Sequence, residues 1–312
     1  MHLDLYIALA GLIVGFTVGL TGMGGGALMT PILVLLFHIQ PLAAVSSDLV
    51  AAVVMKPVGS AVHIKHGTVN KALVKWLVIG SVPFAFLGVL VLKSLGNGQV
   101  VQDRIKLALG YALLLACASI VFKALVQVRQ WGQDRRIERA GGTPTKPPEF
   151  RIRPVPTLVI GALGGLIVGM TSVGSGSLII VLLLLLYPSL RAAQLVGTDL
   201  VQAVPLVASA ALGHLLFGDF KLAVTASLLL GSIPGVYFGA RVSAKAPGGL
   251  VRRALVFVLL ASGLKLINTD NQTLAMVLVA FVIVGPLLWM AARRANGLSA
   301  RPPRIGEIIS AP

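Results

Sequence analysis

The sequence predicts an all-α integral membrane protein, a polytopic helical bundle built from two pseudo-symmetric repeats. The 312 residues are 56% hydrophobic and 12% charged, with a mean hydropathy of +0.93, whereas soluble domains carry about 25% charged residues. Apolar blocks of the length that crosses a bilayer of about 30 Å recur between short polar turns. The second group of these blocks also repeats the first, as the motifs below indicate.

Breakers divide the chain into apolar blocks, each of which is expected to form a helix. The first group occupies residues 4–20, 27–38, 42–64, 71–93 and 104–127. The second group occupies residues 155–172, 177–187, 191–216, 220–243, 250–267 and 272–292. We therefore expect a first transmembrane repeat over 1–127, a cytoplasmic linker over 128–154, a second repeat over 155–267, and an extra C-terminal helix with a cytoplasmic tail over 268–312.

The formal net charge of +16 does not indicate nucleic-acid binding. Lys and Arg lie mostly in loops between the apolar blocks, where basic residues orient a membrane protein. The linker and the tail from Arg293 are both rich in arginine, which is why both are expected in the cytoplasm. Cys117 is the single cysteine, so an intramolecular disulfide and a Cys-based metal or sulfur-relay site are excluded. No metal and no cofactor are expected.

Two glycine-rich segments reveal the internal repeat. The stretch GFTVGLTGMGGGAL begins at Gly15, and GLIVGMTSVGSGSL begins at Gly165, 150 positions later. With an offset of 151 the match continues: Asp48 pairs with Asp199, His63 with His214, Gly67 with Gly218, and GSVP at Gly80 with GSIP at Gly231. Duplicated halves that enclose a site near the membrane midplane are common in transporters.

The number of crossings decides whether the second half is inverted. If the short blocks 27–38 and 177–187 both cross the membrane, each half has five crossings and the halves have opposite orientations. The basic turns Lys65–Lys75 and Arg241–Arg253 and the tail then all lie inside with the linker, and only the turn holding Lys93, Arg104 and Lys106 does not. Four crossings per half would place the Arg241–Arg253 turn and the tail outside. Charge therefore favours inversion.

The glycine-rich segments are expected to break the helices and to form the substrate site. Irregular backbone at membrane depth is tolerated only where it faces protein or a watery cavity. A short helix follows each break, and its N-terminal amides would point back into the break, where they can bind an anion. The expected binding residues are Thr21, Gly22, Gly24, Gly25 and Gly26 in the first break and Thr171, Gly174, Ser175, Gly176 and Ser177 in the second.

Close helix packing is the alternative reading of these glycines. It is the favoured reading for the glycines that recur every four residues, because such residues share one helix face. These are Gly11, Gly15, Gly19, Gly161, Gly165 and Gly169.

Ionisable residues inside apolar blocks are functional candidates, because a charge at membrane depth is expensive. Lys56 lies between AAVVM and PVGSAV, so we expect it to line a pathway and to complement an anion, although it has no partner in the second half. Asp48, Asp199, His63 and His214 are candidates for carrying a coupled proton. The alternatives are ordinary helix caps for the two aspartates and interfacial positions for the two histidines.

The segments TGMGGGALMTPIL and TSVGSGSLIIVLL, the paired SSDLV and GTDLV, and the GSVP and GSIP motifs resemble the TauE/SafE family of membrane permeases, also called the sulfite exporter family. The resemblance covers residues from about 4 to 267 apart from the linker. The family's glycine-rich segment falls on Gly22–Pro31 and its second copy on Gly174–Val181, where the proline is absent and Ser175 and Ser177 replace glycine and alanine. The resemblance implies transport of small sulfur-containing oxyanions, such as sulfite or organosulfonates, across the bacterial cytoplasmic (inner) membrane.

We therefore expect a secondary transporter and not an enzyme, working by alternating access between two halves with proton coupling. Its partners are a small anionic substrate, the lipid bilayer and protons. No Walker motif is present, which argues against ATP-driven pumping by this chain. One alternative is an anion channel, which needs no coupling group. Another is a membrane-embedded enzyme or sensor, which would need a cluster of catalytic or metal-binding residues that five scattered histidines and one cysteine do not supply.

Overall fold

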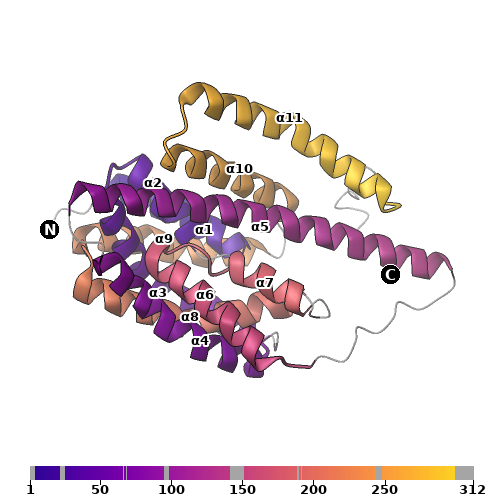
Figure 1. The fold of residues 1–312 in the computed structure, drawn as a ribbon, viewed down its shortest axis with the longest axis horizontal. Coiled ribbons are helices and arrows are strands. Elements are labelled where there is room, and N and C mark those ends of the chain that lie inside the picture. Colours follow the sequence, from indigo (N-terminus) through magenta and orange to yellow (C-terminus); the bar gives the residue numbers. More distant parts are fainter. Residues whose placement is uncertain are drawn as a thin grey trace.

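The computed structural model is a bundle of helices (Figure 1). It describes residues 4–21, 25–65, 67, 69–94, 98–140, 151–187, 190, 192–243 and 248–298. These residues contain no strand. The first half contains α1 (Leu5–Thr21), α2 (Gly26–Leu35), α3 (Pro41–Lys65), α4 (Lys71–Ser94) and α5 (Gln99–Arg139). The second half contains α6 (Pro154–Thr171), α7 (Leu178–Leu186), α8 (Ala192–Phe217), α9 (Leu222–Ser243) and α10 (Gly248–Leu266). The last helix is α11 (Asn271–Ala295).

Each predicted apolar block is a helix, and α5 is the main departure from the predicted bounds. It continues to Arg139, through the first part of the region predicted as a linker. The added residues are mostly Gln, Arg and Glu, which favour helix although they are polar. Hydropathy therefore located the end of the apolar run and missed the end of the helix. Residues 141–150 of the predicted linker and the tail after Leu298 lie outside the described residues.

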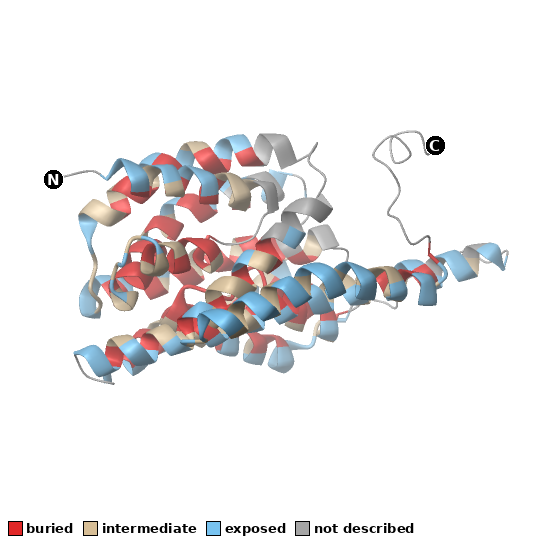
Figure 2. Cartoon of the chain, turned by 90° about the horizontal axis from the view of Figure 1, so that it is seen from above, coloured by how far each residue is buried: buried red, intermediate tan, exposed pale blue. Residues whose placement is uncertain are grey.

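Within the described residues, seven helices are long and apolar enough to cross a membrane: α3, α4, α5, α6, α8, α9 and α11. α2 and α7, with ten and nine residues, follow the two glycine-rich breaks. At 1.5 Å per residue each extends about 15 Å, or half of the hydrocarbon layer. Buried residues lie on the inward faces of the core helices and exposed residues on the outside (Figure 2). The chain is therefore a multi-pass helical membrane protein.

Glycines bring two helix pairs into backbone contact, α1 with α9 and α4 with α6. A methyl group at Gly15 of α1 would lie 2.8 Å from Ser232 Cα of α9, and one at Gly165 of α6 would lie 2.8 Å from Ser81 Cα of α4. No side chain fits at such distances. The packing role is confirmed for the four-residue glycine series at Gly11, Gly15, Gly161, Gly165 and Gly169.

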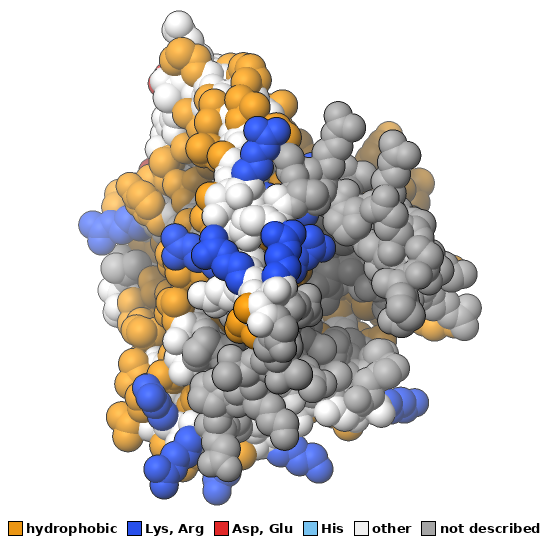
Figure 3. Space-filling view, turned by 90° about the vertical axis from the view of Figure 1, so that its right-hand side faces the viewer, with side chains coloured by type: hydrophobic (Ala, Val, Ile, Leu, Met, Phe, Trp, Pro, Cys, Tyr) orange, Lys and Arg blue, Asp and Glu red, His pale blue; other side chains and the backbone are white. Residues whose placement is uncertain are grey.

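The outer elements are α5, α10 and α11. α5 runs along the whole length of the molecule, with α10 and α11 on one side of it (Figure 1). Asp270 caps the start of α11: its carboxylate accepts a hydrogen bond from the Thr273 N–H at 2.8 Å, and this bond lowers the pKa of Asp270. Lys and Arg side chains gather on the face seen in Figure 3. The last turns of α5 and α11 contain Arg136, Arg139 and Arg294, which are exposed, and Arg293, which is buried.

Candidate functional site

The two breaks contact each other in the core of the bundle. Gly26 is the first residue of α2, and a methyl group there would collide with the carbonyl oxygen of Ser172 and lie 2.6 Å from its Oγ. Ser172 directly follows α6, at the start of the second break. The backbone of one half of the chain therefore rests on the backbone of the other. We call this region, Gly25 and Gly26 together with Ser172–Ser177, the junction.

The second break has a backbone that requires glycine. Gly174 and Gly176 have φ angles of +128° and +94°, which side chains beyond glycine rarely tolerate. The Leu178 N–H donates to the Gly174 carbonyl at 3.0 Å, so the turn leads directly into α7. In the first break, Gly25 lies within the described residues, whereas Gly22, Gly24 and the side chain of Thr21 lie outside them.

Lys56 extends from α3 to the second break. Its side chain is 8% exposed, and Nζ donates a hydrogen bond to Ser175 Oγ. No described carboxylate forms a direct ion pair with it. Asp48 and Asp199 nevertheless interact with it electrostatically, one from each half of the chain. The predicted cation is therefore at the junction, and its nearest partner is a neutral hydroxyl.

Asp48 connects α3 to both breaks. Its Oδ2 accepts hydrogen bonds from Thr30 Oγ1 of α2 at 2.8 Å and from Ser172 Oγ at 2.7 Å. The carboxylate is 2% exposed. α3 begins at Pro41, so Asp48 lies two turns inside the helix, and the helix-cap alternative is wrong for this residue.

Asp199 occupies the matching position on α8. Its Oδ1 accepts a hydrogen bond from Gln202 Nε2 at 3.0 Å, and a backbone hydrogen bond joins it to Gly176 of the second break. Lys56 and Lys123 act on it electrostatically. α8 begins at Ala192, so Asp199 is also inside its helix and is not a cap.

His214 lies in the last turn of α8 and contacts α6 three residues before Ser172. Its ring is fully buried, with Nε2 at 2.8 Å from the Gly169 carbonyl of α6 and Nδ1 at 2.8 Å from Ser46 Oγ of α3. Because a carbonyl only accepts, Nε2 carries a proton. His214 therefore joins three helices inside the bundle. The side chain of His63 lies outside the described residues.

The three predicted hydroxyls of the second break differ in their partners. Thr171 Oγ1 donates to the Ile167 carbonyl at 2.6 Å and accepts from the Val173 N–H at 3.2 Å, so it is satisfied by its own helix end. Ser175 accepts from Lys56. Ser177 precedes α7 and is 7% exposed, and its Oγ has no hydrogen-bond partner in the part of the chain that the structure describes. Buried hydroxyls usually have one.

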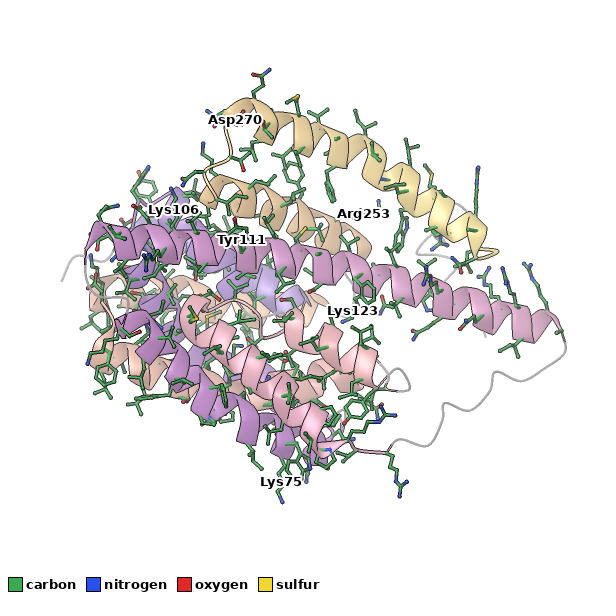
Figure 4. All side chains as sticks on the ribbon, in the orientation of Figure 1. Lys75, Lys106, Tyr111, Lys123, Arg253 and Asp270 are labelled. Carbon is green, nitrogen blue, oxygen red and sulfur yellow. The ribbon has the colours of Figure 1, made fainter. Side chains whose placement is uncertain are left out.

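Sequence reasoning missed several polar residues that complete this region. Lys123 interrupts the apolar run of α5, as Lys56 interrupts that of α3, and it acts electrostatically on Asp199. Figure 4 labels Lys123 on α5, which packs against α7. Thr30, Ser172 and Gln202 are uncharged, and single neutral polar residues in apolar helices do not stand out by composition. Ser81 was missed for the same reason, although its Oγ donates to Gln202 Oε1 at 3.2 Å.

The arrangement combines a buried ammonium, two short-helix N-termini and several hydroxyls around two buried carboxylates. Such donors complement an oxyanion of low molecular weight. The carboxylates provide places for a proton. The described residues hold no group of three His, Cys, Asp or Glu side chains suited to a metal ion.

Most of the chain is similar to known membrane proteins. The family model described as "Sulfite exporter TauE/SafE" matches residues 7–266. The probable membrane transporter protein YjnA of Bacillus subtilis (strain 168) is 39% identical over 267 residues, which cover 84% of this chain and 98% of YjnA. The probable membrane transporter protein YdhB of the same organism is 24% identical over 266 residues, which cover 84% of this chain and 99% of YdhB. No solved structure matches the chain.

Proposed function

The chain belongs to the sulfite exporter TauE/SafE family of membrane transporters, and on this premise we propose that it is a secondary transporter of small sulfur-containing oxyanions. Sulfite and organosulfonates are the substrate class that we infer. We assign substrate binding to the junction and to Lys56, and membrane insertion to the bacterial cytoplasmic membrane. The arginine-rich end formed by α5 and α11 then faces the cytoplasm, in keeping with the distribution of basic residues in membrane proteins.

One observation carries this proposal: the buried ammonium group of Lys56 lies at the second break. Lys56 donates to Ser175, and it forms no direct ion pair with a described carboxylate. Burying a cation is unfavourable unless an opposite charge joins it. The hydroxyl of Ser177 is buried and has no hydrogen-bond partner among the described residues. A sulfur oxyanion would accept hydrogen bonds from both groups.

Equivalent contacts in the two halves of the chain support the proposal that they are pseudo-symmetric repeats. Gly15 contacts Ser232, and Gly165 contacts Ser81. The two glycines are repeat equivalents 150 positions apart, and the two serines are equivalents 151 positions apart. The same pair of contacts therefore occurs twice with the halves exchanged. This is the pattern expected of two pseudo-symmetric repeats, and five helices in each half favour the inverted arrangement.

Alternating access would move the two halves against each other at the junction. α2 belongs to the first half and Ser172 to the second, so the contact at Gly26 joins the parts that have to separate. A buried acid, Asp48 or Asp199, would carry the coupled proton, because each interacts electrostatically with Lys56 at the same site. The described charges that act on Lys56 are these two aspartates and not His214, so we regard His214 as a weaker candidate.

Uptake into proteoliposomes tests the function. The purified chain is reconstituted, and uptake of sulfite, sulfoacetate, taurine, thiosulfate, methanesulfonate and sulfate is measured with and without a proton gradient. We expect sulfite or an organosulfonate to be transported, and the rate to respond to the gradient. Protein-free liposomes give the background. Transport of none of these anions would overturn the proposal, and transport that ignores the gradient would favour an anion channel.

A further inference from the structure

Burial disfavours a charge on Asp199, and the groups around it offset that cost. It is 1% exposed, and it accepts hydrogen bonds from Gln202 Nε2 at 3.0 Å and from the backbone of Gly176. Two ammonium groups act on it electrostatically, Lys56 from α3 and Lys123 from α5. Positive charge or N–H groups therefore reach this one carboxylate from four parts of the bundle: α3, α5, α8 and the second break.

The neighbours that bond to Asp199 donate to it in this structure. Gln202 directs its NH₂ group at Asp199, at 3.0 Å, while its Oε1 accepts from Ser81 Oγ at 3.2 Å. A backbone N–H, such as that of Gly176, donates and never accepts. In this arrangement both neighbours hydrogen-bond to the ionised carboxylate and offset part of the cost of burying its charge.

The environment of Asp48 is different, although the two aspartates are equivalent in the repeat. Its partners are the hydroxyls of Thr30 and Ser172, at 2.8 and 2.7 Å. A hydroxyl accepts as readily as it donates, so these partners suit an ionised and a protonated carboxyl group alike. Of the two lysines, only Lys56 acts on Asp48.

The donors around Asp199 are the kinds of group that bind a sulfonate or sulfite. Backbone N–H groups near a helix N-terminus, side-chain amides and ammonium groups all bond to oxyanions. Lys56 also reaches Ser175, two residues before Ser177 with its unpartnered hydroxyl. Asp199 is therefore an acidic group of the protein that contacts the same kinds of donor as a substrate anion would.

We propose that Asp199 competes with the substrate anion for these donors, so that a proton must neutralise Asp199 before the substrate binds. The inference rests on the proposed function and adds which acid is coupled and how. One proton joins the carboxylate, and the negative charge of the substrate takes the place of the charge that the carboxylate loses. For a monoanion the net charge of the buried site is unchanged, which avoids the cost of an additional buried charge. Proton and anion occupy the site together, so transport is an electroneutral symport.

Of the other elements packed against α8, α6 and α7 contain no ionisable residue. The lysines of α4 are Lys71, Lys75 and Lys93, and Lys71 directly follows Asn70, whose N–H donates to Thr198 Oγ1 at 3.0 Å, one residue before Asp199. Asp48 faces Lys56 from α3. His214 is on α8 itself, about four turns farther along.

Calorimetric titration of the purified chain with methanesulfonate and thiosulfate tests the competition, since neither anion titrates in the pH range used. Each titration is run in two buffers of different ionisation enthalpy, which counts the protons taken up. We expect binding of methanesulfonate to take up about one proton and to weaken about tenfold per pH unit above the titration of Asp199. Asp199→Asn is expected to bind with the same affinity at every pH and to take up no proton. The matched variant Asp48→Asn is expected to keep the wild-type pH slope.

Two outcomes would overturn the inference while leaving the proposed function in place: binding by the wild type without proton uptake, or a wild-type pH slope in Asp199→Asn. Loss of the slope in Asp48→Asn alone would also overturn it, because coupling would then belong to the other acid. If neither anion binds at any pH, the proposed function fails together with the inference. Proton uptake is measured on the wild type, so the inference is tested even if Asp199→Asn does not fold.

Discussion

Gly26 is the residue at which the two halves of the candidate site touch, and it leaves no room for a side chain. Gly26→Ala would place a methyl group against the carbonyl oxygen of Ser172 and 2.6 Å from its Oγ. We expect this variant to lose about 1–3 kcal/mol of stability, as overpacked cores do, and to lose most transport because the junction is pushed apart. Melting midpoints in detergent and uptake into proteoliposomes measure both effects.

Gly25 provides the matched control for Gly26. A methyl group at Gly25 would lie 3.7 Å from Val18 Cγ2 and 3.8 Å from Met55 Cε, which is ordinary contact, and its φ of −60° suits any residue. Gly25→Ala is therefore expected to melt and transport like the wild type. Equal damage from both substitutions would contradict the view that the contact with Ser172 is what requires glycine.

Lys56 is expected to affect binding and stability in opposite directions. Lys56→Met keeps the length of the side chain and removes a buried charge, so the stability of the chain should be unchanged or higher. Sulfite binding should weaken about 10- to 100-fold, since a hydrogen bond to a charged group contributes about 1.5–3 kcal/mol. Titration calorimetry and melting curves separate the two effects. Lys75→Met on the exposed part of α4 is the control (Figure 4), and unchanged sulfite affinity in Lys56→Met would contradict the assignment.

Much of the candidate site was predictable at the level of single residues because charge inside an apolar block is conspicuous. Lys56, Asp48 and Asp199 were predicted on that ground, and all three interact in the structure. What could not be predicted was the identity of their partners. Thr30 and Gln202 reach the carboxylates only because α2 and α8 have particular rotations about their axes, and sequence periodicity in an all-apolar helix does not fix a rotation.

At the scale of helices, the packing of α1 on α9 and of α4 on α6 depends on glycine in both halves. Gly15→Ala and Gly165→Ala would each bring a methyl group to 2.8 Å from a serine Cα of the facing helix. We expect the two variants to lower the melting midpoint by similar amounts, because the contacts are equivalent. Gly285→Ala in α11 has no atom within 4 Å and should leave the midpoint unchanged or raise it slightly.

Thermal unfolding of the three variants followed by size-exclusion chromatography measures this comparison. A large effect at only one of Gly15 and Gly165 would contradict the equivalence of the two seams. The result would bear on the packing of the helices and would leave the assignment of the junction untouched, since neither glycine belongs to it.

Helix positions were predictable because each apolar block ends at a breaker. The bounds of α3 differ from the predicted block by one residue at each end, and those of α4 by one residue at its C-terminal end. α5 shows where the rule fails. Its extension to Arg139 is polar, and helix hydrogen bonding continues through polar residues as easily as through apolar ones.

At the scale of the whole molecule, the site exists only because two distant segments meet. Gly26 and Ser172 are far apart in the chain, and their contact requires that α2 and the second break be brought together by the packing of all the helices between them. The internal repeat predicted two breaks facing one region. It could not predict that the backbones would touch, since that distance is set by side-chain volumes throughout the core.

α11 is the part of the molecule that the rest depends on least. The family match ends at residue 266, and none of the apolar window of α11 is buried. Its large side chains, among them Val282, Leu287 and Leu288, are exposed and suited to lipid. The described contacts of the junction come from α1, α2, α3 and the second break and involve no residue of α11.

A chain that ends after Asn268 is therefore expected to insert, fold and transport without α11. It keeps the hydrogen bond between Lys106 Nζ and Asn268 Oδ1 at 2.9 Å, which fixes the end of α10 against α5. It loses the contact between Gly132 of α5 and Asn296, so the polar end of α5 should become easier to digest with protease. We expect a loss of less than about 2 kcal/mol in stability, a small part of the total for a folded protein, and uptake rates close to those of the full chain. Failure of the shortened chain to fold in the membrane would show instead that α11 supports the bundle through its contacts with α5 and α10.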